Sequence, residues 1–300
     1  MTGSVRPGDL ADRKRRGEPI VMVTAYDHGT ARIAEAAGVD AVLVGDSAAM
    51  TMLGYPSTRE ITVDELLMLT RAVRRGLATP LLVGDLPFGS YEASNADAVA
   101  TARRFAEAGV DVVKLEGGGP MAERARAIIA AGIPVMGHVG LLPQHVADAD
   151  GYRAQGTTAD EAMAILHEAR SLVAAGCFAL VFEAIPAAVV ELLMPSIPVP
   201  VIGIGAGAHT DGQVLVFHDL VGLTEGRLPR FVERYADARP LLVDAVARYA
   251  AATRDRSFPT PAHNYRIAPA ELDAVRARLA RESGARVRER EPGPESPAVC

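Results

Sequence analysis

The sequence predicts an α/β fold of the (β/α)8 class, a TIM barrel, and three observations lead to this class. Short apolar runs rich in β-branched residues recur along the chain, and such runs are typical of strands buried on both faces of a parallel sheet. Ala-rich stretches of helical character separate the runs. The length of 300 residues accommodates one barrel, which takes about 250 residues, and leaves a tail.

The strands follow from the apolar runs taken in order. We expect them at residues 20–26, 41–44, 80–85, 110–116, 134–138, 178–183, 199–205 and 214–217. Several of these runs end on a residue that can titrate or bind a metal ion. Because the carboxyl ends of barrel strands face one common mouth, we expect these polar residues to converge there.

The helices are recognised by their ends. Glycine suits the left-handed turn that ends a helix, and Ala-Gly pairs precede four of the apolar runs, at residues 37–38, 108–109, 131–132 and 175–176. Thr62 with Glu65, and Thr158 with Glu161, are capping boxes that begin two helices. We expect further helices at residues 28–37 and from after residue 231 to residue 254, and a short one from Asp9.

The chain divides into a barrel and an extension. We expect the (β/α)8 catalytic domain to span residues 1–265 and a C-terminal helix to span residues 266–282, with Leu272, Val275 and Leu279 on one side. From residue 283 to 300 Gly, Pro, Arg and Glu dominate, which predicts a disordered tail.

Composition narrows the kinds of partner. Lys and Arg total 31 against 37 Asp and Glu, a net charge of −6, which favours neither nucleic acid nor an anionic membrane surface. No apolar run approaches the roughly 18 residues of a membrane helix. Only Cys177 and Cys300 are present, so we expect no disulfide framework and no cysteine metal site. These features favour a small-molecule ligand and a reducing, cytoplasmic compartment.

Three acids follow or end predicted strands. Asp46, Asp85 and Glu116 offer hard oxygen donors, which suit Mg²⁺. Any one of them alone is more often a helix N-cap, but three in one mouth favour a site. Lys114 lies two residues before Glu116, so both side chains point to the same side of the strand, and we expect them to point into the barrel.

Two further candidates end later strands. His138 lies among small residues that leave room for a ligand, although a packed, hydrogen-bonded histidine explains it equally well. Glu183 has apolar neighbours, an environment that suits a carboxylate to moving protons. The glycine triplet at residues 203, 205 and 207 resembles a phosphate-binding turn, but close backbone packing at the mouth is the simpler interpretation.

Longer motifs connect these candidates to a known family. The motifs are Gly45-Asp46-Ser47 and the segments at residues 53–55, 70–73, 85–91, 113–118, 137–141, 151–156, 203–207 and 211–213. In order and spacing they resemble ketopantoate hydroxymethyltransferase, and the resemblance runs from about Asp9 to Pro261.

The resemblance implies a (β/α)8 barrel that transfers the one-carbon unit of its co-substrate, 5,10-methylenetetrahydrofolate, to 3-methyl-2-oxobutanoate. The product would be 2-dehydropantoate (ketopantoate), for pantothenate and coenzyme A biosynthesis, formed through an enolate whose charge a metal ion stabilises. The resemblance also implies one Mg²⁺ per subunit and a homo-oligomer, commonly a decamer.

Residue roles carry over by motif. Asp46 and Asp85 would bind the metal and contact the substrate, with Glu116 as a further metal ligand. The remaining substrate-binding residues would be Ser47, Lys114 and His138. Glu183 would be the catalytic proton acceptor, acting either at the substrate or at a folate nitrogen.

The chain also departs from the usual family pattern. Ala48-Ala49 stands where the family has Leu-Gly, Leu142 and His145 stand where Thr and Ser are usual, and Arg59-Glu60 replaces an apolar-proline pair. Two alternatives therefore stay open: a paralogue that hydroxymethylates or aldol-cleaves a different 2-oxo acid, and a non-catalytic barrel that only binds a metabolite.

Overall fold

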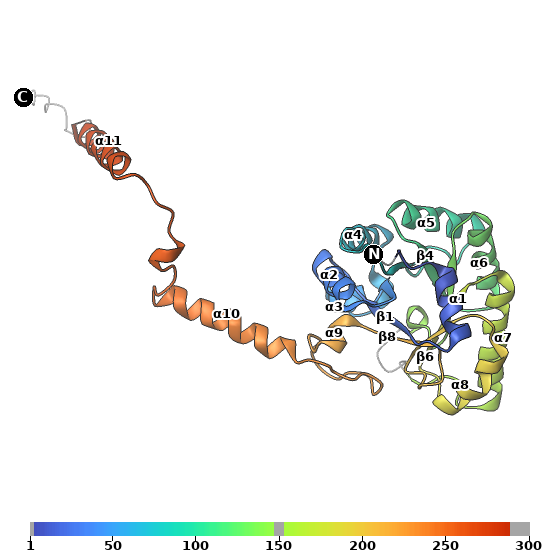
Figure 1. Cartoon of the computed structure of the whole chain (residues 1–300). Coiled ribbons are helices and arrows are strands. Elements are labelled where there is room, and N and C mark those ends of the chain that lie inside the picture. The colour runs from blue at the N-terminus through green and yellow to red at the C-terminus, as the bar shows by residue number, and fades with distance from the viewer. Residues whose placement is uncertain (1–2, 147–152, 289–300) are drawn as a thin grey trace, which may run out of the picture. The chain divides into compact units, whose positions relative to one another are not determined.

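The computed structural model describes residues 3–146 and 153–288, and its centre is a closed barrel of eight parallel strands (Figure 1). The strands are β1 Ile20–Thr24, β2 Ala41–Val44, β3 Leu81–Asp85, β4 Val112–Glu116, β5 Val135–Gly140, β6 Ala179–Glu183, β7 Val201–Ile204 and β8 Gly212–Leu215. Each pairs with its neighbours in sequence order, and β8 pairs with β1 to close the ring. The predicted (β/α)8 class is therefore confirmed.

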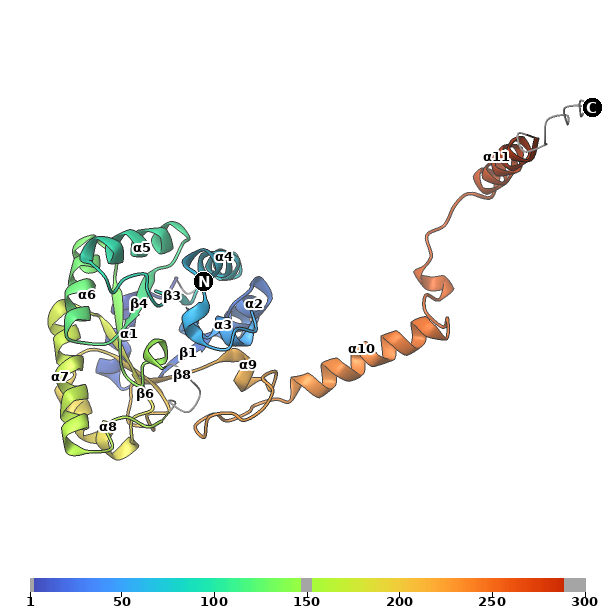
Figure 2. The same ribbon diagram turned by 180° about the vertical axis from the view of Figure 1, so that it is seen from behind.

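Helices surround the barrel (Figure 2). They are α1 Pro7–Arg16, α2 His28–Ala37, α3 Ala48–Thr51, α4 Val63–Arg74, α5 Asn95–Glu107, α6 Pro120–Ala130, α7 Ala159–Ala175, α8 Ala187–Leu193 and α9 Phe217–Leu220, with 3-10 turns that include η1 Thr58–Glu60 and η2 Pro143–His145. Both predicted capping boxes are present, at Thr62 and Thr158. The four predicted helix-ending glycines all have positive φ.

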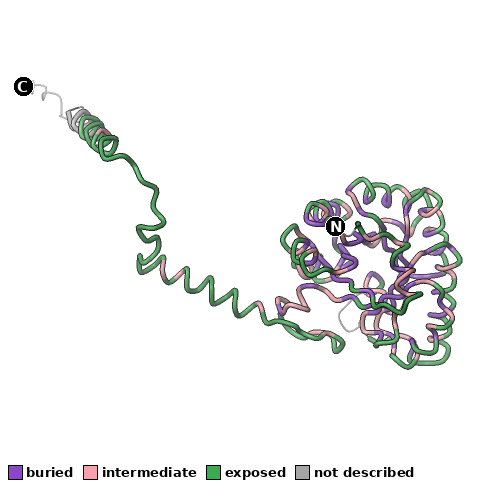
Figure 3. Tube along the Cα trace, in the orientation of Figure 1, coloured by how far each residue is buried: buried purple, intermediate pink, exposed green. Residues whose placement is uncertain are grey.

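The barrel has an apolar interior that is closed at its amino end. Met22, Leu81, Val112 and Met136 belong to one buried cluster inside the ring, and Leu10 of α1 joins them with 0% of its surface exposed. A second buried cluster fills the space between the strands and the outer helices, so buried residues follow the barrel wall (Figure 3). This packing leaves the carboxyl ends of the strands for polar side chains.

The last strand begins earlier than predicted. The apolar run pointed to residues 214–217, whereas β8 begins at Gly212 and Phe217 begins α9. A Cβ atom at Gly212 would lie 2.3 Å from the carbonyl oxygen of Ile20, so only glycine allows β8 to approach β1 here. The start of β8 therefore depends on how closely its backbone approaches β1, and the pattern of apolar residues gives no sign of this.

The C-terminal part forms a separate compact unit. By its internal contacts the chain divides into Met1–Arg239 and Pro240–Cys300. The expected end of the catalytic domain at residue 265 stays a prediction. Helix α10 Ala238–Arg254 has no buried residue. Helix α11 Pro269–Arg288 continues six residues past the expected end at 282, and the predicted disorder of residues 289–300 lies outside the described residues. Among the helices that the structure describes, none has the length and apolar character needed to cross a membrane.

Candidate active site

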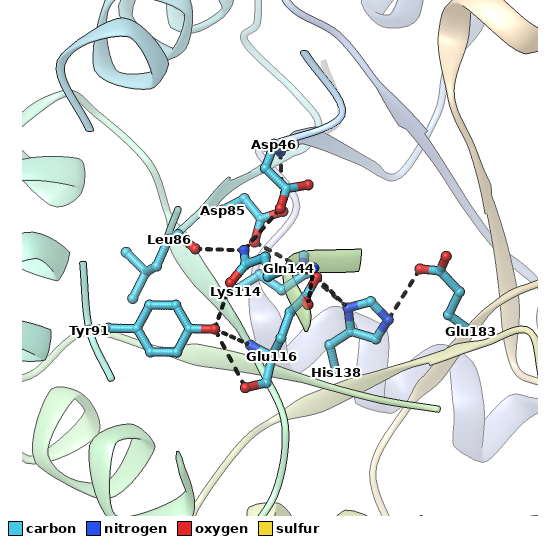
Figure 4. A network of polar contacts seen from close by, with 9 residues as sticks. All are labelled: Asp46, Asp85, Leu86, Tyr91, Lys114, Glu116, His138, Gln144 and Glu183. Atoms are coloured by element: carbon cyan, nitrogen blue, oxygen red, sulfur yellow. Dashed lines mark hydrogen bonds and ion pairs between the residues drawn. The ribbon is translucent and has the colours of Figure 1, made fainter. Parts of the chain in front are cut away.

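Five successive strands bring the predicted site residues to one rim of the barrel (Figure 4). Asp46 follows β2, Asp85 ends β3, Lys114 and Glu116 lie in β4, His138 lies in β5 and Glu183 ends β6. The sheet register pairs Asp85 with Lys114 and Glu116 with His138, so these side chains occupy neighbouring positions at the mouth. Apart from Glu183, whose side chain is 13% exposed, these residues are buried.

The two aspartates meet, and a lysine joins them. The backbone N–H of Asp46 donates to Asp85 Oδ2 at 3.3 Å. Lys114 Nζ lies 2.8 Å from Asp85 Oδ1 and 3.5 Å from Glu116 Oε1. The acids predicted from separate strand ends therefore share one buried centre.

Burial and mutual repulsion perturb these groups. Burial, together with the charges of Asp85 and Glu116, raises the pKa of Asp46 well above its usual value. Burial also raises the pKa of Asp85 despite the opposing charge of Lys114. Burial opposes the charge of Lys114, but the neighbouring carboxylates outweigh it and raise the pKa of this ammonium group. Lys114 is thus a fixed positive charge within an excess of negative charge.

His138 connects the acidic centre to Glu183. Its Nδ1 atom lies 3.3 Å from Glu116 Oε1 and its Nε2 atom lies 3.2 Å from Glu183 Oε2. Burial and the charge of Lys114 oppose protonation, but Glu116 and Glu183 outweigh them and raise the pKa of His138 to about 9. When protonated, the ring forms an ion pair with each of the two carboxylates, and Lys114 Nζ also lies 3.3 Å from its Nδ1 atom.

Sequence reasoning missed three residues that support this centre. Gln144 in η2 is 0% exposed, and its Nε2 atom donates to Asp46 Oδ2 at 2.9 Å. The hydroxyl of Tyr91 donates to Gln144 Oε1 at 2.8 Å, and the hydroxyl of Tyr26 contacts Ser47 Oγ at 2.8 Å. Tyr91 lies inside the motif at residues 85–91, and Gln144 follows β5 by four residues, but neither is a residue type that signals buried polar support.

A cavity of about 1760 Å³ lies over the rim. The residues that line it include Asp46, Ser47, Asp85, Lys114, Glu116, His138 and Glu183. Arg153, Arg227 and Arg230 line other parts of the same cavity. Beside β7, a Cβ atom at Gly205 would lie 2.5 Å from Phe231 Cδ1, which supports the close-packing interpretation of the glycine triplet.

The donor set fits a divalent cation in charge and chemistry. Four carboxyl groups, those of Asp46, Asp85, Glu116 and Glu183, surround two basic side chains, Lys114 and His138. A bound cation would offset the repulsion that contributes to the raised pKa of Asp46. Asp46 and Asp85 supply the hard oxygens that Mg²⁺ prefers. Within residues 3–146 and 153–288, no three carboxylate, His or Cys side chains could enclose an ion by themselves. Water or a bound oxo acid would have to complete the coordination, as Mg²⁺ sites in proteins commonly require.

Comparison with known proteins places the chain in a family. Residues 4–261 match the family model described as ketopantoate hydroxymethyltransferase. The 3-methyl-2-oxobutanoate hydroxymethyltransferase of Nitratidesulfovibrio vulgaris is 48% identical over 278 residues, which is 92% of this chain and 91% of the relative. The enzyme of the same name from Acidothermus cellulolyticus is 51% identical over 258 residues, 86% of this chain and 95% of the relative.

Solved structures agree on the fold. A phosphonopyruvate hydrolase in complex with oxalate and Mg²⁺ superposes with a TM-score of 0.57 at 14% identity, covering 93% of this chain and 98% of that one. A phosphoenolpyruvate phosphomutase from Streptomyces platensis subsp. rosaceus gives 0.55 at 19% identity, with 93% and 98% covered. At this level of identity the likeness shows the barrel alone.

The closed barrel and the buried ionisable cluster at its carboxyl rim define an enzyme of the (β/α)8 class. Within that class, the match over most of the chain is specific. The chain belongs to the ketopantoate hydroxymethyltransferase family and is a transferase.

Proposed function

We propose that this enzyme transfers the one-carbon unit of 5,10-methylenetetrahydrofolate to 3-methyl-2-oxobutanoate, forming 2-dehydropantoate for pantothenate and coenzyme A biosynthesis. The observation that carries the proposal is the buried centre at the barrel mouth, where Asp46 and Asp85 adjoin Lys114 and where His138 links Glu116 to Glu183. Removing a proton next to a keto group needs a base and a stabilised negative charge, and this centre offers both.

Asp46 and Asp85 are the residues that we propose hold Mg²⁺. When bound, this ion would act as a Lewis acid toward the keto group of the substrate. Glu116 was predicted as a third ligand. Its Oε1 atom already faces Lys114 and His138, and its Oε2 atom accepts the backbone N–H of Gln144 at 3.1 Å. We therefore propose that Glu116 would support the site next to the ion rather than hold the ion itself.

Lys114, Ser47 and His138 are the residues that we propose contact the oxo acid. The Lys114 ammonium group keeps its charge inside the centre, so it attracts the substrate carboxylate and the negative charge that develops on deprotonation. Ser47 Oγ is held by the Tyr26 hydroxyl and lines the cavity. Both groups are thus oriented before the substrate binds.

Glu183 is the proposed proton acceptor. His138 holds its Oε2 atom at 3.2 Å, and Glu183 is the most exposed carboxylate of the centre, at the cavity wall. We propose that Glu183 takes the proton from the carbon next to the keto group. Water releases the methylene carbon from both folate nitrogens at the oxidation level of formaldehyde, and the deprotonated carbon adds to this unit, so that the water oxygen becomes the hydroxyl group of the product. Alternatively, Glu183 acts at a folate nitrogen. Exchange of the substrate β-proton in D₂O separates these two assignments.

The folate co-substrate requires room and positive charge. The cavity of about 1760 Å³ provides the room above the centre. Arg153, Arg227 and Arg230 line this cavity and are exposed, so we propose that they attract the carboxylates of the folate glutamate tail.

The departures from the family pattern leave the cavity untouched. Ala48 and Ala49 are both 0% exposed, and neither they nor Leu142 line the cavity among the described residues. This placement favours 3-methyl-2-oxobutanoate over a different 2-oxo acid. It weakens the paralogue alternative that the sequence left open.

A panel of 2-oxo acids, assayed with methylenetetrahydrofolate and Mg²⁺, tests the proposal. We expect 3-methyl-2-oxobutanoate to give the highest kcat/KM, and a clear preference for another oxo acid would overturn the assignment. In D₂O without folate, we expect the enzyme to exchange the β-proton of 3-methyl-2-oxobutanoate. A barrel that only binds a metabolite would show no exchange, and loss of exchange in Glu183→Gln would assign Glu183 to the substrate rather than to the folate.

We also propose that the enzyme works in the cytoplasm as a homo-oligomer, a decamer by its resemblance to the family. The free thiol of Cys177 is buried, which is consistent with a reducing compartment. Exposed apolar residues on α10, among them Leu241, Val246 and Tyr249, support assembly because such side chains gain free energy when a neighbouring subunit covers them.

A further inference from the structure

Gln144 contacts Asp46, a proposed metal ligand, and Glu116 beside it, without lining the cavity. Its side chain donates to Asp46 Oδ2 at 2.9 Å and to the Leu86 carbonyl oxygen at 3.0 Å (Figure 4). Its backbone N–H donates to Glu116 Oε2 at 3.1 Å. Gln144 is 0% exposed and is not among the described residues that line the cavity. Any effect of Gln144 on the chemistry must therefore act through these acids.

The hydrogen bonds fix the amide in one orientation. Both hydrogens of Nε2 are used, one by Asp46 and one by Leu86. A flipped amide would turn its oxygen toward a carboxylate and a carbonyl group, which are both acceptors. A flipped amide would lose its hydrogen bonds to Asp46 and Leu86, and these buried polar groups would be left without partners, which costs free energy.

Tyr91 fixes the other end of the amide. Its hydroxyl oxygen accepts the backbone N–H of Glu116 at 3.1 Å, which leaves its single hydrogen for Gln144 Oε1 at 2.8 Å. The alternative acceptor, the Glu116 carbonyl oxygen, is farther away at 3.5 Å. Tyr91 is fully buried, so water does not compete for this bond.

The turn that carries Gln144 is also braced from outside. The ring of His145 packs edge-on against Phe88, with centroids 6.4 Å apart. The guanidinium carbon of Arg59 lies 4.3 Å from the centroid of the same Phe88 ring. Arg59 and His145 are both positions where this chain departs from its family, and both side chains contact the same Phe88 ring.

We propose that Gln144, oriented by Tyr91, is a positioning residue for the metal centre. It holds Oδ2 of Asp46 and thereby presents the other carboxylate oxygen to the cation, while its backbone N–H holds Glu116 in place beside it. This role rests on the proposed function, because it requires that Asp46 binds the cation. Residues that orient metal ligands typically contribute about 10- to 100-fold to metal affinity.

Titration of the metal-stripped protein with Mg²⁺, without substrates and followed by calorimetry, tests this role. We expect Gln144→Met to bind Mg²⁺ at least about tenfold more weakly than the wild type. Tyr91→Phe should weaken binding in the same direction but less, since the amide keeps its bonds to Asp46 and Leu86. The double variant should bind no more weakly than Gln144→Met, because both changes act through the same amide.

Two variants serve as matched controls. Gln213 is an exposed glutamine whose Nε2 atom also makes two hydrogen bonds, to Gly207 O and Thr210 Oγ1, both at 2.8 Å. Gln213→Met should leave Mg²⁺ affinity at the wild-type value, and so should Tyr235→Phe, at a tyrosine that is 70% exposed. A melting curve of each protein separates stability from affinity, because a merely structural role lowers the melting temperature without changing the Mg²⁺ affinity of the folded protein.

The outcomes separate this role from the proposed function. If the wild type binds Mg²⁺ and both Gln144→Met and Tyr91→Phe bind it with the same affinity, the positioning role is overturned. The proposed function is not affected by that result. Failure of the wild type to bind Mg²⁺ would overturn the metal assignment and this role together. If Gln144→Met does not fold, Tyr91→Phe decides: weaker binding supports the role, and unchanged binding contradicts it.

Discussion

At the scale of single residues, the buried acidic centre lowers the stability of the metal-free fold. Asp46 is buried beside Asp85 and Glu116, and its raised pKa means that the folded state disfavours its charge. A buried carboxyl group of this kind, when it is ionised, reduces the stability of the metal-free protein. Binding sites commonly keep groups of this kind because function, not stability, requires them.

Asp46→Asn should therefore stabilise the metal-free protein while abolishing turnover. The amide removes a buried negative charge but keeps an oxygen that can accept from Gln144. We expect the free energy of unfolding at neutral pH to rise by about 1 to 2 kcal/mol, measured by urea titration in the presence of a chelator. Asp273→Asn, at a side chain that is 71% exposed, is the control and should change stability little. A destabilised Asp46→Asn protein would contradict the charge argument.

Glu183→Gln should fold, bind the oxo acid and turn over at least about a hundredfold more slowly, the scale of a lost general base. The amide keeps the shape of the carboxylate and can still face His138 Nε2. Steady-state kinetics measure the change in kcat, and binding of 3-methyl-2-oxobutanoate by calorimetry shows that the site persists. Near-normal turnover would make Glu183 a structural residue. Glu191→Gln, at a side chain that is 63% exposed, should turn over normally.

His138 gives the metal-free protein a pH-dependent stability. Because its pKa is raised to about 9 in the folded chain, the charged ring stabilises the fold fully below the unfolded value of about 6.5, and this contribution is lost as pH rises through about 9. Urea unfolding between pH 7 and pH 10 should show a decrease on the order of 1 to 3 kcal/mol. His138→Gln should lose this dependence, whereas His209→Gln, at a side chain that is 48% exposed, should keep it.

At the scale of elements, strands were easier to predict than the turns between them. The apolar runs located all eight strands, and Ala-Gly pairs and capping boxes located several helix ends, because each depends on residues close in sequence. The acids at strand ends followed from barrel geometry. Gln144 and Tyr91 did not, since their roles depend on contacts between residues 53 positions apart in the chain. A polar residue in a turn gives no local sign of such burial.

Gly140 at the end of β5 illustrates a contact that only the structure reveals. Its φ is +96°, and a Cβ atom there would lie 2.3 Å from the carbonyl oxygen of Glu183. Gly140→Ala should reduce the free energy of unfolding by about 3 kcal/mol or more and lower kcat, because β6 must move Glu183 to relieve the clash. Urea titration and steady-state assays measure both effects.

Gly132→Ala provides the matched comparison. Its φ is +88°, but no atom lies within 4 Å of the added Cβ, so only backbone strain is introduced. We expect a cost of about 1 kcal/mol and an unchanged kcat. Equal effects of the two substitutions would mean that the contact with Glu183 does not matter.

At the scale of the whole molecule, the chain consists of a barrel unit and a C-terminal unit. Removal of residues 240–300 should leave a folded barrel that binds Mg²⁺ but forms smaller particles, because the exposed apolar side chains of α10 are lost. Light scattering coupled to size exclusion measures this against the full chain of 31.5 kDa, and circular dichroism checks the fold. An unchanged particle size would show that α10 does not contribute to the assembly.

The ring closes late along the chain. β1 pairs with β8, and Thr24 Oγ1 accepts the backbone N–H of Phe217 at 2.9 Å, although 193 positions separate the two residues. During synthesis, the acidic rim residues leave the ribosome well before the strand that completes the circle. A nascent chain that ends before β8 leaves β1 and β7 as unpaired edges, so the ring that encloses the aspartates can close only after β8 has left the ribosome.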